Sequence, residues 1–144
     1  MLVQQILKGR GDVPVISVKP ETSVSDAVSI LAKRRIGVLV VSADGVRPDG
    51  ILSERDIVRS LALRGTTCLN ETVDEMMTRN PTCASLRDTS DDVLKRMTDG
   101  RFRHMPVIEE DKLVGIVSIG DVVHARLSEL SMEKDALQGM IMGH

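Results

Sequence analysis

Aromatic residues are almost absent from this sequence of 144 residues, which contains one phenylalanine, Phe102, and neither tryptophan nor tyrosine. Proteins that bind single-stranded nucleic acids stack the bases on aromatic side chains, and nucleic-acid binding in general needs a surplus of positive charge. The formal net charge is −2 and the isoelectric point is about 5.9. We therefore expect no nucleic-acid partner, and a core built from aliphatic residues and methionines.

Long apolar runs and paired cysteines are also missing. No stretch approaches the roughly 18–20 apolar residues of a membrane span, and the N-terminal MLVQQILKGRGD lacks the long apolar segment of a signal peptide. The two cysteines, Cys68 and Cys83, form no C-x-x-C motif. Lone thiols without a secretion signal are typical of intracellular proteins. The sequence therefore predicts a cytoplasmic protein that has no membrane contact.

Signatures of catalysis and of metal binding are lacking as well. The sequence contains no G-x-S-x-G nucleophile turn, no H-E-x-x-H zinc motif and no G-x-x-x-x-G-K-[ST] phosphate loop. Its histidines are not clustered with carboxylates at the spacing that a metal ion needs. We expect neither an enzyme, nor a catalytic cofactor, nor a metal site.

What the sequence does contain is an internal repeat. The phrase GILSERDIV, from Gly50 to Val58, returns as GIVSIGDVV, from Gly115 to Val123, a shift of 65 positions (115 minus 50). Upstream, a shift of 66 positions places residues 21–41 on residues 87–107. The difference of one residue falls in the turn between the two matched regions, where changes of length are best tolerated.

Each copy of the repeat has the same order of expected elements. Largely apolar residues at i, i+3, i+4 and i+7 predict a helix that begins at a Ser or Thr cap, at Thr22 or Ser23 and at Thr89 or Ser90. Two short apolar strands follow, and then a second helix. The fold class is therefore α/β (α+β). Two β-α-β-β-α units pack sheet to sheet as a pseudo-two-fold pair, because one unit alone buries only a marginal core.

This pattern divides the chain into four segments. Residues 1–64 form the first repeat with an N-terminal helix, residues 65–80 a linker with a short helix, and residues 81–128 the second repeat. Residues 129–144 form a helical tail. The last helix of the second repeat either runs on through this tail or breaks within it.

The Ser-x-x-Asp motif that precedes the second helix of each repeat has two interpretations. Ser at the N-cap and an acidic residue at N3 form a capping box, which is a purely structural device. Alternatively, a carboxylate offers two acceptor oxygens to the paired hydroxyl groups of a ribose. The free backbone N–H groups of the first turn would then favour a phosphate. The duplication fits either interpretation, because a duplicated unit also copies its caps.

Taken together, these motifs resemble a known family. Two β-α-β-β-α copies that each end in G-I-[LV]-S-x-x-D-[IV], with VDEMMTRNP at Val73–Pro81 between them, resemble a tandem pair of cystathionine-β-synthase (CBS) domains, a stand-alone Bateman module. The resemblance spans about residues 12–128. It implies a regulatory module that binds an adenine nucleotide or adenosyl compound in clefts between the repeats, with AMP as the first candidate and ATP or NAD as alternatives. It also implies a homodimer and an unknown client protein.

The resemblance assigns roles to individual residues of this sequence. The ribose would be bound by Asp56 and Asp121. The phosphate would be bound by Ser53, Ser118, Arg103 and His104. The adenine would lie against the first strand of each repeat and the strand after its first helix, at Ile16, Gly37, Val38, Thr82 and Met105.

The two copies of the motif differ in their middle residues. The first reads Ser53-Glu54-Arg55-Asp56, whereas the second has Ile119 and Gly120 in the middle positions. Arg55 either contacts the phosphate of a ligand or is a surface residue. We therefore expect two inequivalent sites.

A second function remains open from the sequence alone. The tail contains several apolar residues, among them Leu130, Leu137 and Met140. Methionine suits an adaptable binding surface. The alternative is thus a ligand-free dimeric interaction scaffold that docks a client through its C-terminal helix.

Overall fold

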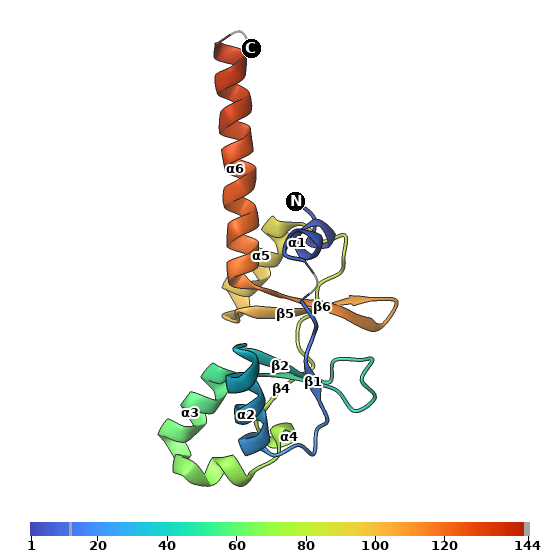
Figure 1. Ribbon diagram of the computed structural model, residues 1–144, viewed down its shortest axis with the longest axis vertical. Helices are drawn as coiled ribbons and strands as arrows, with labels where there is room; N and C mark the ends of the chain where they lie inside the picture. Colours follow the sequence, from blue (N-terminus) through green and yellow to red (C-terminus); the bar gives the residue numbers. More distant parts are fainter. Residues whose placement is uncertain (12, 143–144) are drawn as a thin grey trace.

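The computed structural model describes residues 1–11 and 13–142, and it contains two halves that each combine a small sheet with helices (Figure 1). The elements alternate as the repeat predicts, with short additional elements at the N-terminus and in the linker. In chain order they are α1 (Val3–Gly9), β1 (Ser17–Val18), α2 (Val24–Arg34), β2 (Val38–Val41), β3 (Gly50–Ser53), α3 (Glu54–Arg64), the 3-10 helix η1 (Gly65–Asn70), α4 (Val73–Met76), β4 (Thr78–Arg79), α5 (Ser90–Gly100), β5 (His104–Glu109), β6 (Lys112–Ser118) and α6 (Ile119–Ile141).

The two sheets face each other across the middle of the molecule, and the helices cover their outer sides (Figure 1). The first sheet has the order β1-β2-β3-β4, with β1 and β2 parallel and the other pairs antiparallel. The second contains β5 and β6, and an isolated parallel bridge joins Ala84 to Val107. This bridge lies 66 positions after the Val18–Val41 pair of the first sheet. The predicted fold class and sheet-to-sheet packing are confirmed.

Equivalent caps begin and end the first helix of each repeat. The hydroxyl oxygens of Ser23 and Thr89 accept hydrogen bonds from the backbone N–H groups three residues later, at 3.0 and 3.1 Å. Both helices end at an arginine in the left-handed conformation, Arg35 with φ 53° and Arg101 with φ 57°. Glycine is the usual residue there. The shared left-handed turn directs the chain from the helix into the following strand in the same way in both repeats.

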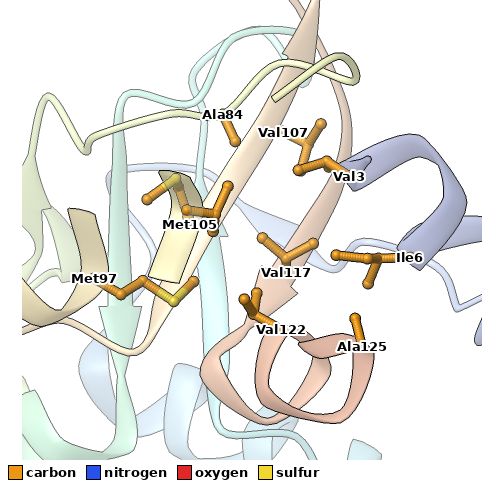
Figure 2. Close-up of a cluster of buried hydrophobic side chains, with 10 residues drawn as sticks. Val3, Ile6, Ala84, Met97, Met105, Val107, Val117, Val122 and Ala125 are labelled. Carbon is orange, nitrogen blue, oxygen red and sulfur yellow. The ribbon is translucent and has the colours of Figure 1, made fainter. Parts of the chain in front are cut away.

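Each half has its own aliphatic core, because the apolar side chains of its sheet and helices converge between them. Figure 2 shows the core of the second half, where the side chains of Met97 and Met105 lie among smaller aliphatic side chains. The buried residues of this second core are Val3, Ile6, Ala84, Val93, Met97, Met105, Val107, Val117, Val122 and Ala125. Those of the first core are Val24, Ala27, Leu31, Leu39, Val41, Leu52, Ile57 and Val73.

The N-terminal helix α1 packs on the second repeat, although sequence order groups it with the first. The backbone N–H of Val3 donates to the carbonyl of Asp88 at 2.9 Å. The linker helix α4 makes the equivalent bond to the first repeat, from the N–H of Val73 to the carbonyl of Thr22 at 2.7 Å. Each repeat is therefore completed by the short helix that precedes the other repeat, and the chain crosses between the halves twice.

The last helix, α6, is continuous from Ile119 to Ile141 and extends well beyond the second half (Figure 1). The predicted tail is therefore mostly one helix with the second repeat, and its last two residues lie outside the described part of the chain. Within residues 1–11 and 13–142, no helix is both long enough and apolar enough to cross a membrane.

Candidate functional site

Both Ser-x-x-Asp motifs form capping boxes at a strand-to-helix junction. Oδ2 of Asp56 accepts the backbone N–H of Ser53 at 2.9 Å, and the Ser53 hydroxyl accepts the N–H of Asp56 at 3.2 Å. The corresponding bonds between Ser118 and Asp121 measure 2.9 and 3.1 Å. Within the described chain, Oδ1 of neither aspartate is engaged in these boxes. The motif is therefore a cap in both repeats, and each cap leaves one carboxylate oxygen for another partner.

A cleft of about 300 Å³ opens at the first motif, between the two halves. The first half contributes the start of α3, and the second contributes the segment that joins α5 to β5. Of the residues assigned to a ligand from the sequence, six line this cleft: Gly37, Ser53, Arg55, Asp56, Arg103 and His104. Its volume is at the lower end of the usual range for small-molecule sites.

Two backbone hydrogen bonds position the walls of this cleft. The N–H of Glu54 donates to the carbonyl of Gly37 at 2.9 Å, and the N–H of Ile119 donates to the carbonyl of Arg103 at 2.7 Å. Each bond ties the first residue of a helix to the residue directly before a strand. Gly37 also lies close to the Glu54 side chain, because a Cβ at residue 37 would be 3.2 Å from its Oε1.

The cleft also contains residues that the sequence did not assign to a ligand. Phe102, the one aromatic residue of the chain, lines it beside Gly100. A Cβ on Gly100 would overlap the Phe102 ring, so the absence of a side chain at residue 100 leaves room for the ring. Arg59 and Arg101 line the cleft as well. The signal in the sequence was a lone aromatic residue between two arginines at a strand start.

Positive charge exceeds negative charge among the residues that line the cleft. Four guanidinium groups are present there, from Arg55, Arg59, Arg101 and Arg103, against the two carboxylates of Glu54 and Asp56. The N-terminus of α3 opens into the same space, and the backbone dipoles there favour an anion. This arrangement suits a ligand that carries both phosphate and hydroxyl groups, since guanidinium groups bind phosphate and carboxylates bind hydroxyls.

His104 is largely neutral in this environment. Burial lowers the pKa of its imidazole below the ordinary value of 6.5, and Arg103 acts in the same direction. Asp121 and Glu54 raise the pKa, but their effect is smaller. At neutral pH His104 therefore offers hydrogen bonds to a ligand instead of a full positive charge.

The second aspartate is engaged with a cation of the chain itself. Nη1 of Arg10 lies 2.7 Å from Oδ2 of Asp121, and both side chains are mostly buried. The Nε atom of Arg10 is buried and has no hydrogen-bond partner within the described residues. Asp121 and Arg10 line a separate cavity of about 420 Å³ between α1 and α6, which also contains Gly120 and His124.

Arg10 lies in a segment that is longer than its counterpart before the second repeat. Leu7 lies against Gly115 as Met77 lies against Gly50, so these two residues mark equivalent positions. From Leu7 to Ile16 the chain advances nine positions (16 minus 7), whereas from Met77 to the matching Thr82 it advances five (82 minus 77). The segment that contains Arg10 is thus four residues longer than its counterpart, and the two motifs differ in their surroundings.

The remaining residues assigned to adenine lie outside the first cleft. Ile16 packs against the first core, and Val38 pairs with Ser53 in the first sheet. Thr82 is exposed. Met105 is fully buried in the second core, so its side chain is not available to a ligand and only its backbone is (Figure 2).

A duplicated β-α-β-β-α unit, with its two sheets face to face and a polar cleft at the junction, defines a class of tandem-repeat modules. The sequence matches the CBS domain family over residues 11–63 and 73–128. The chain belongs to the CBS domain family.

Relatives of known structure share this architecture. The CBS-domain containing protein ATU1752 from Agrobacterium tumefaciens is 42% identical, with a TM-score of 0.82 over 88% of this chain and 99% of that one. The CBS domain protein PAE2072 from Pyrobaculum aerophilum, whose structure is a complex with AMP, is 26% identical, with a TM-score of 0.76 over 92% of this chain and 99% of that one.

A curated relative is longer than this chain. It is the mitochondrial CBS domain-containing protein CBSX3 of Arabidopsis thaliana, which is 33% identical over 127 residues and 85% of this chain. The chain spans 62% of the length of CBSX3 and 22% of a second Arabidopsis relative.

Proposed function

We propose that this chain is a regulatory module that binds an adenine nucleotide in the cleft at Asp56, with AMP as the first candidate and ATP or NAD as alternatives. The observation that carries the proposal is the convergence of a carboxylate, a hydroxyl group and four guanidinium groups from both repeats on one cleft. Membership of the CBS family and the AMP complex of PAE2072 support an adenosine ligand.

Each group in the cleft has a chemical role in this proposal. Oδ1 of Asp56 accepts the ribose hydroxyls while Oδ2 keeps the capping box intact. Arg55 and Arg103 bind the phosphate, with the N-terminus of α3 behind them. Phe102 stacks on the adenine. Stacking of this kind is not specific for one base, because every base has a π-face. The backbone of Gly37 allows the base to approach closely.

One ligand binds per chain in this proposal, because Arg10 occupies the carboxylate of the second motif. A ribose at Oδ1 of Asp121 would bind a carboxylate whose charge is already paired, because Nη1 of Arg10 lies 2.7 Å from Oδ2. Asp56 makes no such ion pair within the described residues. The two motifs therefore differ in the ion pair of their aspartate as well as in their sequence.

Other predictions from the sequence extend the proposal. The module binds its ligand without turning it over, acts in the cytoplasm, and passes the signal to a client protein as a homodimer. Incubation with each nucleotide followed by chromatography tests for turnover. The appearance of a product, with its loss in Asp56→Asn, would contradict a purely regulatory role.

The direct test is a titration of AMP, ATP, NADH and S-adenosylmethionine into chain that has been unfolded and refolded to remove any bound ligand. A thermal shift provides the screen. Ligand at about 100 times its Kd adds about 2.7 kcal/mol to the free energy of unfolding, which raises the Tm by several degrees at this size. Saturable binding of one adenosine compound supports the proposal, and silence from all four in folded protein contradicts it.

A further inference from the structure

The helix α6 presents a row of apolar side chains that the rest of the described chain leaves partly or largely exposed. Val123, Leu127, Leu130, Leu137 and Ile141 are 41–83% exposed. They follow one another at intervals of four, three, seven and four residues (127 minus 123, 130 minus 127, 137 minus 130, 141 minus 137). These are the a and d positions of a heptad repeat, and Lys134 completes the series at its one polar a position. We call this row the α6 seam.

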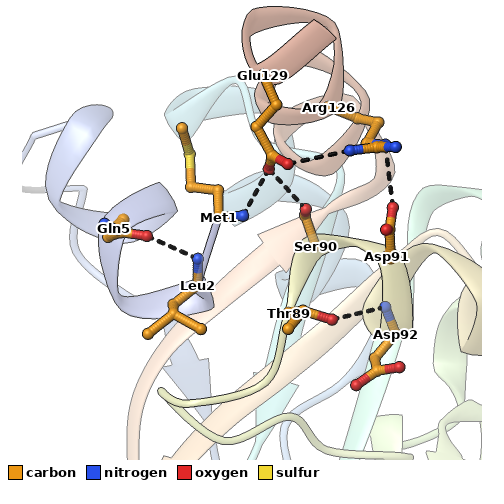
Figure 3. Close-up of polar contacts among 9 residues, drawn as sticks. All are labelled: Met1, Leu2, Gln5, Thr89, Ser90, Asp91, Asp92, Arg126 and Glu129. Carbon is orange, nitrogen blue, oxygen red and sulfur yellow. Dashed lines mark hydrogen bonds and ion pairs between the residues drawn. The ribbon is translucent and has the colours of Figure 1, made fainter. Parts of the chain in front are cut away.

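The α6 seam is distinct from the face through which α6 packs on its own half. Val122 and Ala125 point into the second core (Figure 2). Glu129, on the same side, accepts the Ser90 hydroxyl at 2.9 Å and lies 2.7 Å from the amino group of Met1 (Figure 3). In the heptad these three residues occupy the c and f positions, opposite a and d. The helix therefore has one face for its own repeat and a second apolar face directed away from it.

The distal part of α6 has no support from the rest of the described chain. Arg126 and Glu129 mark the last polar anchors, to Asp91, Ser90 and Met1 (Figure 3). Every residue from Ser131 to Gln138 is exposed. An isolated helix of about a dozen residues is marginal in water, and most helical stability comes from packing of an apolar face. A partner that covers the α6 seam would supply that stability.

We propose that the α6 seam is a short parallel coiled coil with α6 of a second copy of this chain. A heptad row is complementary to a copy of itself, because each a or d side chain inserts between four residues of a facing helix with the same repeat. In the parallel, in-register arrangement, Lys134 lies next to the partner's Glu133, which occupies the adjoining g position. The symmetry gives two such pairs, so the one charged position of the seam is neutralised by its neighbour.

The proposal does not depend on ligand binding, and cross-linking tests it directly. On a Cys83→Ser background, Leu137→Cys places a thiol on the seam, and Met132→Cys places one on the opposite side of the same helix, where Met132 is 64% exposed. A disulfide needs Cα atoms about 4.4–6.8 Å apart, a distance that only seam positions reach in the parallel pair. Mild oxidation should convert most of the Leu137→Cys chain into a covalent dimer and leave Met132→Cys monomeric. Equal yields, or no dimer from Leu137→Cys, would overturn the proposal.

Charge exchange at the centre of the seam provides the second test. In sedimentation equilibrium, Lys134→Glu should weaken self-association at least tenfold, because it places carboxylates beside the partner's Glu133. Combining it with Glu133→Lys should restore the association. Lys134→Ile should strengthen it, since β-branched residues at a favour two-stranded coils. A wild-type chain that stays monomeric, or a double variant no better than Lys134→Glu, would overturn the parallel arrangement.

Discussion

Arg10 and Asp121 form an ion pair across 111 positions of the sequence, with Nη1 and Oδ2 2.7 Å apart. The equivalent carboxylate of the first repeat, Asp56, makes its described bonds to Ser53 alone. A duplicated motif has thus come to occupy two different environments. The difference arises because α1 packs on the second repeat. The segment that leads from α1 to β1 therefore begins beside Asp121.

Removing Arg10 should open the second motif to ligand. In Arg10→Gln, calorimetric titration with AMP should give two sites per chain instead of one, because Asp121 loses its internal cation and keeps its capping box. The loss of this mostly buried pair should cost more stability than the roughly 0.2–1 kcal/mol of an exposed pair, because the Asp121 carboxylate is left without its cation. Lys8→Gln removes a nearby charge from α1 and serves as the control, with one site retained. A single site in Arg10→Gln would show that something other than the ion pair closes the second motif.

Phe102 should contribute to affinity through stacking. Phe102→Leu keeps an apolar side chain beside Gly100 but removes the aromatic face, and base–aromatic stacking is worth about 1–3 kcal/mol. We expect AMP to bind roughly tenfold more weakly, with little change in the urea midpoint of the free protein. If ribose 5-phosphate, which has no base, loses the same affinity in this variant, the ring does not act on the adenine.

Met105 should matter for folding and not for binding, because its side chain is fully buried in the second core. Met105→Ala removes most of a buried side chain and should lower the free energy of unfolding by about 2–5 kcal/mol. Met105→Leu nearly conserves the volume and should cost less than about 1.5 kcal/mol. Urea unfolding measures both. A weaker affinity for AMP in the stable Met105→Leu variant would indicate that this side chain does reach the ligand.

His104 should make the stability of the chain depend on pH. Its folded pKa is lowered by burial, against the opposing effects of Asp121 and Glu54. The unfolded chain therefore takes up a proton near pH 6.5, at which the folded imidazole is still neutral. This stabilising contribution is complete above pH 6.5 and is lost as the pH falls through the lower, folded pKa. Urea unfolding at pH 7.5 and 5.0 should show a smaller loss for His104→Gln than for the wild type. Equal losses would contradict the assigned direction.

The sequence was sufficient for the architecture because the two copies of the repeat carry matching signals. The hydroxyl caps at Ser23 and Thr89 and the apolar periodicity after them predicted both helices, and the structure has both. The left-handed turn at Arg35 and Arg101 was not predictable from the sequence, because glycine is the residue that usually signals it.

The surroundings of the site were less predictable, because they depend on contacts between residues far apart in sequence. No local pattern shows that α1 completes the second repeat, and so none places Arg10 beside Asp121. The side of the strand that Met105 occupies depends on the register of β5 with β6. Phe102 packs against the second core and also lines the cleft, and no local pattern in the sequence shows both contacts.

The most direct test of the account compares two matched variants, Asp56→Asn and Asp121→Asn, by calorimetric titration with AMP. Both substitutions alter the same position of equivalent capping boxes, so their effects through the cap should be similar. Asp121→Asn additionally removes the ion pair with Arg10. A charge-assisted hydrogen bond is worth about 1.5–3 kcal/mol, or roughly 10–100-fold in affinity. We expect Asp56→Asn to lose this much affinity and Asp121→Asn to retain the wild-type value. Equal losses in the two variants, or none in Asp56→Asn, would contradict this expectation.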